Sequence, residues 1–197
     1  MTEELLQQAM GLFDTAEKWN AFVELSYNKN EIANRWWKNL QRELVKQSCE
    51  SGYSEWTFDI WNAWDIQWRL KKFQNTYIAV HSWAGFNYRL WIRNADEDRR
   101  NRIYTLLDTE RFVMLKSMPK LVNLNRASNE VVWDAHFQFD FSDSCDSNWS
   151  KMVEMFAWRA GNDTENMARQ IMGQVNRFRT PEMTSLFEEL NEELNGI

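Results

Sequence analysis

Apolar residues recur at intervals of three and four through the first 50 residues, which is the spacing of one face of an α-helix. A short helix is expected over residues 3–12, ending near Gly11. Asp14, followed three residues later by Glu17, resembles the capping box that begins a helix. The polar residues 28–30 are expected to interrupt the longer helical region. Its apolar positions are Trp19, Phe22, Val23, Ile32, Ala33, Trp36, Trp37, Leu40 and Leu44.

The period changes to two at Trp56, as expected for β-strands with one buried face. The even apolar positions are Trp56, Phe58, Ile60, Trp64, Ile66, Trp68, Leu70, Ile78, Val80, Phe86, Tyr88, Leu90 and Ile92. The alternation lapses at Asn62, which indicates a turn or bulge, and later continues on both sides of Gly85. The sequence therefore predicts a four-stranded antiparallel meander over residues 54–93.

The second half of the chain returns to helical spacing, apart from one alternating segment. A helical stretch is expected over residues 96–118, ended by Pro119, and a fifth strand over residues 131–141. Residues 147–195 are expected to be helical again. Three helix-start signals occur there: Ser147-Asn148, Asn162 with Glu165, and Thr180-Pro181.

Helices and strands follow one another in blocks, and no internal repeat or linker-like segment interrupts residues 1–197. This order is typical of α+β proteins rather than of alternating α/β folds. We therefore predict a single α+β domain with a Trp-rich antiparallel sheet of about five strands. The N- and C-terminal helices are expected to flank that sheet.

Twelve tryptophans are many for a chain of 197 residues, and each buried aromatic side chain removes about 150–250 Å² from water. In the predicted meander, tryptophans at even-numbered positions lie on the apolar face of the sheet. Tryptophans at odd-numbered positions lie on the opposite face, which mixes polar and apolar residues. The even set is Trp56, Trp64 and Trp68, and the odd set is Trp61, Trp83 and Trp91. The even set explains folding, so a functional surface is sought on the odd face.

The formal charge of −6 disfavours a primary role in binding nucleic acid, because affinity for the phosphate backbone comes mainly from Lys and Arg. Cys49 and Cys145 have neither a disulfide-framework spacing nor a zinc-ligand spacing. The acidic N-terminus and the absence of a long apolar run disfavour a signal peptide and a membrane span. We therefore expect a soluble cytoplasmic protein that does not interact with membranes.

The sequence contains no nucleotide-binding, zinc-protease or nucleophile-elbow motif, which removes support for most cofactor-dependent and triad enzymes. No cofactor is therefore expected. Asp134, His136 and Asp140 would place three metal-ligating residue types on one face of the predicted fifth strand. A strand with one solvated face has the same pattern, and we favour that interpretation.

Asp59, Asp65 and Gln67 share the odd face of the first predicted hairpin and form a candidate catalytic site. Metal-dependent nucleases of the PD-(D/E)XK type hold Mg²⁺ with two acidic residues and place a Lys two residues after the second acid. Gln67 stands at that Lys position and supplies no positive charge. Under this interpretation Mg²⁺ would be the cofactor, and cleavage would be weak or absent.

A likeness to a known group of proteins is carried by the segments LFDTAEKWNAFVEL and NRWWKNLQ, the Trp-rich strands and the closing AGNDTENMARQIMGQVNRFRTPEMTSLFEELNE. Together these segments resemble uncharacterised bacterial proteins that are grouped with the PD-(D/E)XK nucleases. The likeness spans most of the chain and includes no diagnostic motif. It implies that Asp65 and Gln67 occupy the catalytic acid and Lys positions, where Gln67 departs from the pattern. The resemblance therefore favours a nuclease-like ancestry more than nuclease activity.

The odd face also carries aromatic residues interleaved with arginines. The candidate binding residues are Trp61, Arg69, His81, Trp83, Arg89, Trp91 and Arg93. Such faces stack the bases of single-stranded nucleic acid in other sheet-based proteins, with about 1–3 kcal/mol for each base. The alternative is that a helix covers these tryptophans and that carboxylates pair with the arginines, since a large exposed apolar patch is unfavourable.

The missing catalytic motifs, the acidic balance and the many aromatic residues lead us to a non-catalytic binding protein that acts through protein–protein interaction. The alternatives are a weak Mg²⁺-dependent nuclease-like protein and single-stranded nucleic-acid binding through the Trp/Arg face. The last helix carries four carboxylates, which suit either a basic partner protein or a solvated helix face. They belong to Glu188, Glu189, Glu192 and Glu193.

Overall fold

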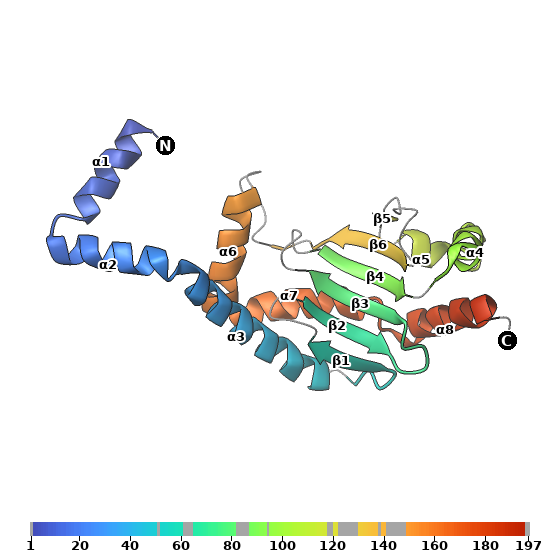
Figure 1. Cartoon of the computed structure of the whole chain (residues 1–197). Helices are drawn as coiled ribbons and strands as arrows, with labels where there is room; N and C mark the ends of the chain where they lie inside the picture. The colour runs from blue at the N-terminus through green and yellow to red at the C-terminus, as the bar shows by residue number, and fades with distance from the viewer. Residues whose placement is uncertain are drawn as a thin grey trace.

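The computed structural model describes residues 2–50, 52–60, 65–81, 87–93, 95–117, 120–121, 130–137, 139–140 and 149–195. The helices in these ranges are α1 (Glu3–Leu12), α2 (Ala16–Tyr27), α3 (Lys29–Glu50), α4 (Glu97–Leu107), α5 (Val113–Ser117), α6 (Trp149–Asn162), α7 (Thr164–Asn176) and α8 (Pro181–Asn195). The strands are β1 (Trp56–Ile60), β2 (Asp65–Leu70), β3 (Thr76–His81), β4 (Asn87–Arg93), β5 (Lys120–Leu121) and β6 (Glu130–His136). Figure 1 shows helices packed against a sheet and an N-terminal extension that leads away from it.

The strands form one antiparallel sheet in the order β1-β2-β3-β4-β6-β5. The sequential pairing of β1 to β4 agrees with the predicted meander, and the blocks of helices and strands confirm the α+β class. The expected count of about five strands was wrong, because the described residues include six strands. The additional strand, β5, has only two residues, which is too short to show an alternating pattern.

Strand β6 ends at His136, so the strand predicted over residues 131–141 was too long. Phe137 and Phe139 follow it and are buried, and their ring centroids lie 5.7 Å apart. Phe139 also contacts Phe156 of α6, at a centroid distance of 5.3 Å. The apolar alternation continues beyond the sheet because these phenylalanines fill the core without strand pairing.

The predicted helix starts are close to the observed ones. Thr15 rather than Asp14 caps α2, since its hydroxyl accepts a hydrogen bond from the backbone N–H of Lys18 at 3.2 Å. Asp14 instead pairs with the ammonium of the same Lys18 at 2.6 Å. Asp96 caps α4 and accepts from the backbone N–H of Arg99 at 2.9 Å. The expected helical stretch 96–118 consists of two helices, α4 and α5, and the three start signals near the C-terminus precede α6, α7 and α8.

The even positions of the meander face the main hydrophobic core. Trp68, Leu70 and Ile78 are fully buried there with side chains of α3, α7 and α8. Tyr77 and Ala79, on the odd side of β3, form a separate small cluster. Helix α7 passes behind the strands in Figure 1, and Phe187 of α8 packs against the even-position Trp56, so both helices lie on the even face. The odd face is therefore the side of the sheet that these helices leave uncovered.

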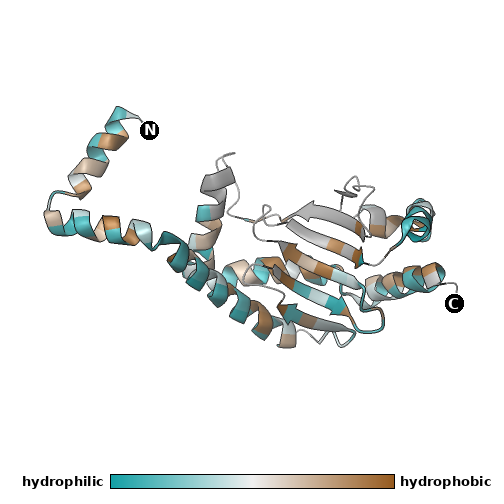
Figure 2. Cartoon of the chain, in the orientation of Figure 1, coloured by the Kyte–Doolittle hydropathy of each residue, from teal (hydrophilic) through white to brown (hydrophobic). Residues whose placement is uncertain are grey.

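Helices α1 and α2 lie away from the sheet, and we call them the arm (residues 2–28). None of the residues in α1 or α2, all of which the structure describes, is buried. Figure 2 shows hydrophobic positions along both helices, although they project beyond the rest of the molecule. Of the expected flanking helices at the N-terminus, only α3 contributes to the core.

Candidate functional site

Backbone pairing brings several of the predicted site residues together on the odd face of the sheet. Asp59 of β1 is directly opposite Gln67 of β2, and Asp65 is opposite His81 of β3. Arg69 is opposite Tyr77 in the next row. Directly opposed residues in neighbouring strands lie about 4.5–5.5 Å apart at their Cα atoms, so these rows are in mutual reach.

Asp59 is engaged in an ion pair. The guanidinium of Arg69 donates to one carboxylate oxygen of Asp59, and the side-chain amide of Gln67 donates to the same oxygen at 3.4 Å. Gln67 is only 5% exposed, so the hydrogen bonds to Asp59 are partly shielded from solvent. A carboxylate that is neutralised by an Arg is poorly placed to hold Mg²⁺, because the guanidinium occupies the position of the cation.

The described residues contain no group of three or more His, Cys, Asp or Glu side chains that could hold a metal ion. The side chain of Asp65 lies outside this description. Asp140, which was expected to share a strand face with Asp134 and His136, lies beyond the end of β6. Its carboxylate accepts from the side-chain amide of Gln170 in α7 at 2.6 Å. The expectation of those three residues on one strand was therefore wrong.

Tyr77 lies between two arginines on the odd face. The guanidinium carbons of Arg69 and Arg93 lie 5.4 Å and 5.1 Å from the centroid of its ring. Both contacts have the geometry of a cation–π interaction. Tyr77 is 8% exposed, so its ring offers little surface for stacking a nucleic-acid base. The two arginines thus stabilise the sheet surface, and their role in binding stays a prediction.

The remaining candidate residues of the Trp/Arg face are described in part. Trp61 and Trp83 lie outside the described residues. For His81, Arg89 and Trp91 the structure describes the backbone, which pairs within β3 and β4. Stacking of bases on this face therefore stays a prediction.

The four carboxylates of α8 are engaged within the molecule. Lys72 pairs with Glu192 at 2.7 Å and with Glu188 at 3.5 Å. Arg111 pairs with Glu189 at 3.0 Å and with Glu193 at 3.3 Å. These ion pairs tie α8 to the β2–β3 turn and to the segment after α4. The acidic face of α8 is therefore a poor candidate for a basic partner.

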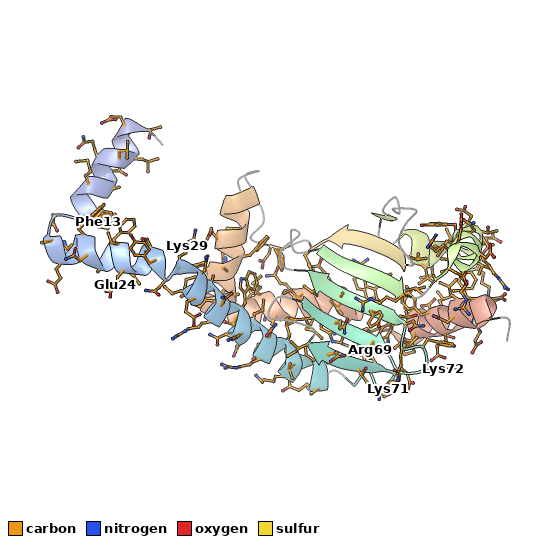
Figure 3. The ribbon with its side chains drawn as sticks, in the orientation of Figure 1. Phe13, Glu24, Lys29, Arg69, Lys71 and Lys72 are labelled. Atoms are coloured by element: carbon orange, nitrogen blue, oxygen red, sulfur yellow. The ribbon has the colours of Figure 1, made fainter. Side chains whose placement is uncertain are left out.

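The arm displays most of the exposed large apolar side chains among the described residues. They are Leu5, Leu6, Met10, Leu12, Trp19, Phe22, Leu25 and Tyr27, with exposed fractions from 42% to 84%. Scattered exposed apolar residues are ordinary, but eight in one extension of this length form a candidate binding surface. Figure 3 shows side chains projecting from α1 and α2, where Phe13 and Glu24 are labelled.

An aromatic cluster holds the corner of the arm. The ring of Phe13 lies 4.6 Å from that of Phe22 and 5.7 Å from that of Trp19. Trp19 and Phe22 also contact each other, at 5.7 Å. At the other end of α2, Lys29 at the start of α3 pairs with Glu154 of α6 at 2.5 Å. The arm therefore has a defined corner, and the start of α3, which follows the arm, is attached to α6.

The arm is acidic. Its charged residues are Glu3, Glu4, Asp14, Glu17 and Glu24, with Lys18 as the single basic residue. Lys18 pairs with Asp14, and no ion pair within the described part of the chain engages the four glutamates. Sequence reasoning missed this surface, because its apolar spacing is the same as that of a buried helix. An excess of acidic residues does not distinguish the arm either, because the acidic helix α8 packs in the core.

Comparison with known proteins gives no match: no family model, no curated protein and no solved structure is significantly similar to this chain. The resemblance to nuclease-grouped proteins is therefore still an expectation. None of the helices within the described ranges is long and apolar enough to cross a membrane.

Proposed function

We propose that this chain is a non-catalytic binding protein whose arm docks into another protein. The observation that carries the proposal is the exposure of eight large apolar side chains on α1 and α2. An amphipathic helix commonly binds by laying its apolar face into a groove of a partner. The aromatic cluster at the corner supports this role, because a preorganised element loses less conformational entropy on binding.

The charge of the arm indicates the chemistry of the partner. Four glutamates that form no ion pair within the described part of the chain surround the apolar positions, so the complementary surface is an apolar groove bordered by Lys and Arg. A second copy of the same arm would bring like charges together, which disfavours pairing of two arms. Each of the eight side chains is at least 42% exposed, so the arm offers a set of large apolar groups to an interface.

A matched pair of variants tests the proposal. Trp19 on the arm is 50% exposed and Trp158 on α6 is 49% exposed, so Trp19→Ser and Trp158→Ser remove similar surface at different places. We expect Trp19→Ser to weaken capture of a stoichiometric partner at least tenfold, since exposed aromatic anchors dominate many interfaces. Trp158→Ser should leave capture unchanged.

A photocrosslinking residue at Leu25 then locates the contact on the captured partner. Crosslinks to an apolar segment flanked by Lys or Arg, in a complex reconstituted from both purified proteins, would support the proposal. Crosslinks to a second copy of this chain would contradict it. Equal capture by wild type and Trp19→Ser would contradict it as well.

A further inference from the structure

Arg179, immediately before α8, is a buried cation. It is 3% exposed, and no carboxylate of the described residues forms an ion pair with it. Its Nη1 donates to the side-chain oxygen of Asn176 at 3.1 Å, whereas its Nε has no hydrogen-bond partner in the described part of the chain. Burial lowers the pKa of Arg179 to about 10. A charge that is withdrawn from water normally requires an opposite charge or a full set of hydrogen bonds.

Aromatic rings satisfy only part of this requirement. The guanidinium carbon of Arg179 lies 4.6 Å from the ring centroid of Tyr53 and 5.8 Å from that of Trp68. Such rings contact the flat faces of a guanidinium. The N–H groups at its edge remain suited to a planar pair of oxygens, as in Arg–carboxylate and Arg–phosphate pairs.

Arg179 lines a cavity of about 290 Å³ between the end of α3 and the edge of the sheet. Ser48, Tyr53 and Ser54 add hydroxyl groups to the lining, and none of the lining residues within the described ranges carries a carboxylate. Trp56 and Phe58 add aromatic surface. The N–H of Trp56 donates to Thr184 at 2.9 Å, so this side chain presents apolar surface rather than a free donor. The cavity thus combines one buried cation, hydroxyl groups and an apolar wall.

Lys71 brings a second cation to the same cavity. It is exposed, and its ammonium forms no ion pair with the residues that the structure describes. The neighbouring Lys72 differs, because Glu188 and Glu192 of α8 engage its ammonium. Figure 3 labels both lysines at the turn that follows β2. Lys71 also borders a second cavity of about 380 Å³, which is lined by the cations Lys72, Arg93 and Arg99 as well.

We propose that the cavity at Arg179 binds a small organic oxyanion, a carboxylate or phosphate monoester carried on an aromatic body. Arg179 holds the oxyanion through its edge, and Lys71 adds a charge at the mouth of the cavity. Trp56 and Phe58 pack against the aromatic body. A volume near 290 Å³ fits one such molecule, since ligand pockets begin at about 300 Å³. This site is separate from the arm and does not depend on the function proposed for it.

Calorimetric titration with benzoate, phenyl phosphate and inorganic phosphate tests the site. We expect the better of the two aromatic anions to bind at least tenfold more tightly than inorganic phosphate, and their order identifies the preferred oxyanion. Arg179→Met should weaken binding tenfold or more, because it removes the charged hydrogen-bond donor. Lys71→Gln should weaken binding several-fold. The matched control Lys72→Gln should not, because Glu188 and Glu192 already engage the Lys72 ammonium.

Cys49 provides a second measurement that does not require Arg179→Met to fold. This thiol is exposed and lines the cavity, and Cys145→Ser leaves it as the one cysteine of the chain. An anionic thiol reagent should modify Cys49 several-fold faster than a cationic one. The preference should shrink in Lys71→Gln, and phenyl phosphate or benzoate should slow the reaction.

Three results would overturn the site. The first is no heat of binding from either aromatic anion at millimolar concentration. The second is an inorganic phosphate affinity equal to that of the aromatic anions. The third is an equal response of Lys71→Gln and Lys72→Gln in both measurements.

Discussion

Helices α1 and α8 share an acidic, amphipathic character but lie in opposite environments. Both have apolar residues at helical spacing. Met183, Phe187 and Leu190 of α8 are buried against the sheet, whereas no residue of the fully described α1 is buried. An amphipathic pattern therefore indicates that one helix face packs against an apolar neighbour. It does not indicate whether that neighbour belongs to the same chain.

The charged faces of the same two regions differ in a parallel way. Basic residues of the chain engage the carboxylates of α8, through Lys72 and Arg111 among others. Glu3 and Glu24 of the arm form no ion pair with any residue in the described ranges. In α8 both faces of the helix are used for folding. In the arm no residue of α1 or α2 is buried, and its four glutamates form no ion pair within the described ranges.

The largest effect is expected from truncating matched phenylalanines in the two regions. Phe187→Ala should lower the free energy of unfolding by about 3–5 kcal/mol, because it leaves a cavity in a fully buried site. Phe22→Ala should lower it by less than about 1 kcal/mol, since the ring is 43% exposed and contacts only its neighbours Phe13 and Trp19 among the described rings. Urea denaturation measures both. Equal losses would show that the arm is part of the cooperative core.

A second test addresses α6, which contacts the helix that carries the arm. A methyl group at Gly161 would overlap the ring of Trp36 in α3, so Gly161→Ala should cost about 1–3 kcal/mol. A methyl group added at Gly173 in α7 would meet open space. Gly173→Ala should therefore stabilise the protein by about 0.5–1 kcal/mol, because Ala favours a helix more than Gly does. Thermal unfolding of the two variants should shift in opposite directions. A neutral Gly161→Ala would contradict the close packing of α6 on α3.

Much of the sheet could be predicted because its signal is local. The apolar even positions between Trp56 and Ile92 alternate with polar residues within each strand, and those whose side chains the structure describes lie in the core or pack against it, apart from the half-exposed Ile60. The start of α8 was equally clear, since Pro181 occupies its first position. The end of β6 was not predictable, because Phe137 and Phe139 keep the apolar alternation without keeping the strand.

The candidate surfaces depend on contacts between distant residues, which the sequence pattern does not contain. Trp19 and Trp37 have the same helical spacing, but only Trp37 is buried, because α6 and α7 pack on α3 whereas α2 projects beyond them. The pairing of Asp59 with Arg69 required the strand register. No local signal marked Arg179 as buried, since the aromatic rings around it come from other parts of the chain.

A third test compares matched asparagines. Asn191 of α8 exchanges hydrogen bonds with the buried hydroxyl of Thr76, at 3.0 Å and 3.2 Å. Asn191→Ala should cost about 1–2 kcal/mol, because the hydroxyl is left without a partner. Asn20→Ala on the exposed surface of α2 should change stability by less than about 0.5 kcal/mol. Chemical denaturation that gave the same cost for both would contradict the difference between the two regions.

The smallest effect concerns the charges. The hydrogen bond that Lys72 donates to Glu192 raises the pKa of Lys72 above its ordinary value of 10.5. A raised pKa favours the charged folded form, so the stabilisation is complete below pH 10.5 and is lost as the pH rises through the folded-state pKa. Glu192→Gln should return the pKa of Lys72 toward 10.5, whereas Glu24→Gln in the arm should leave it unchanged. NMR titration of the Lys72 side chain measures this, and an unchanged pKa in Glu192→Gln would show that the acidic face of α8 is as free as that of the arm.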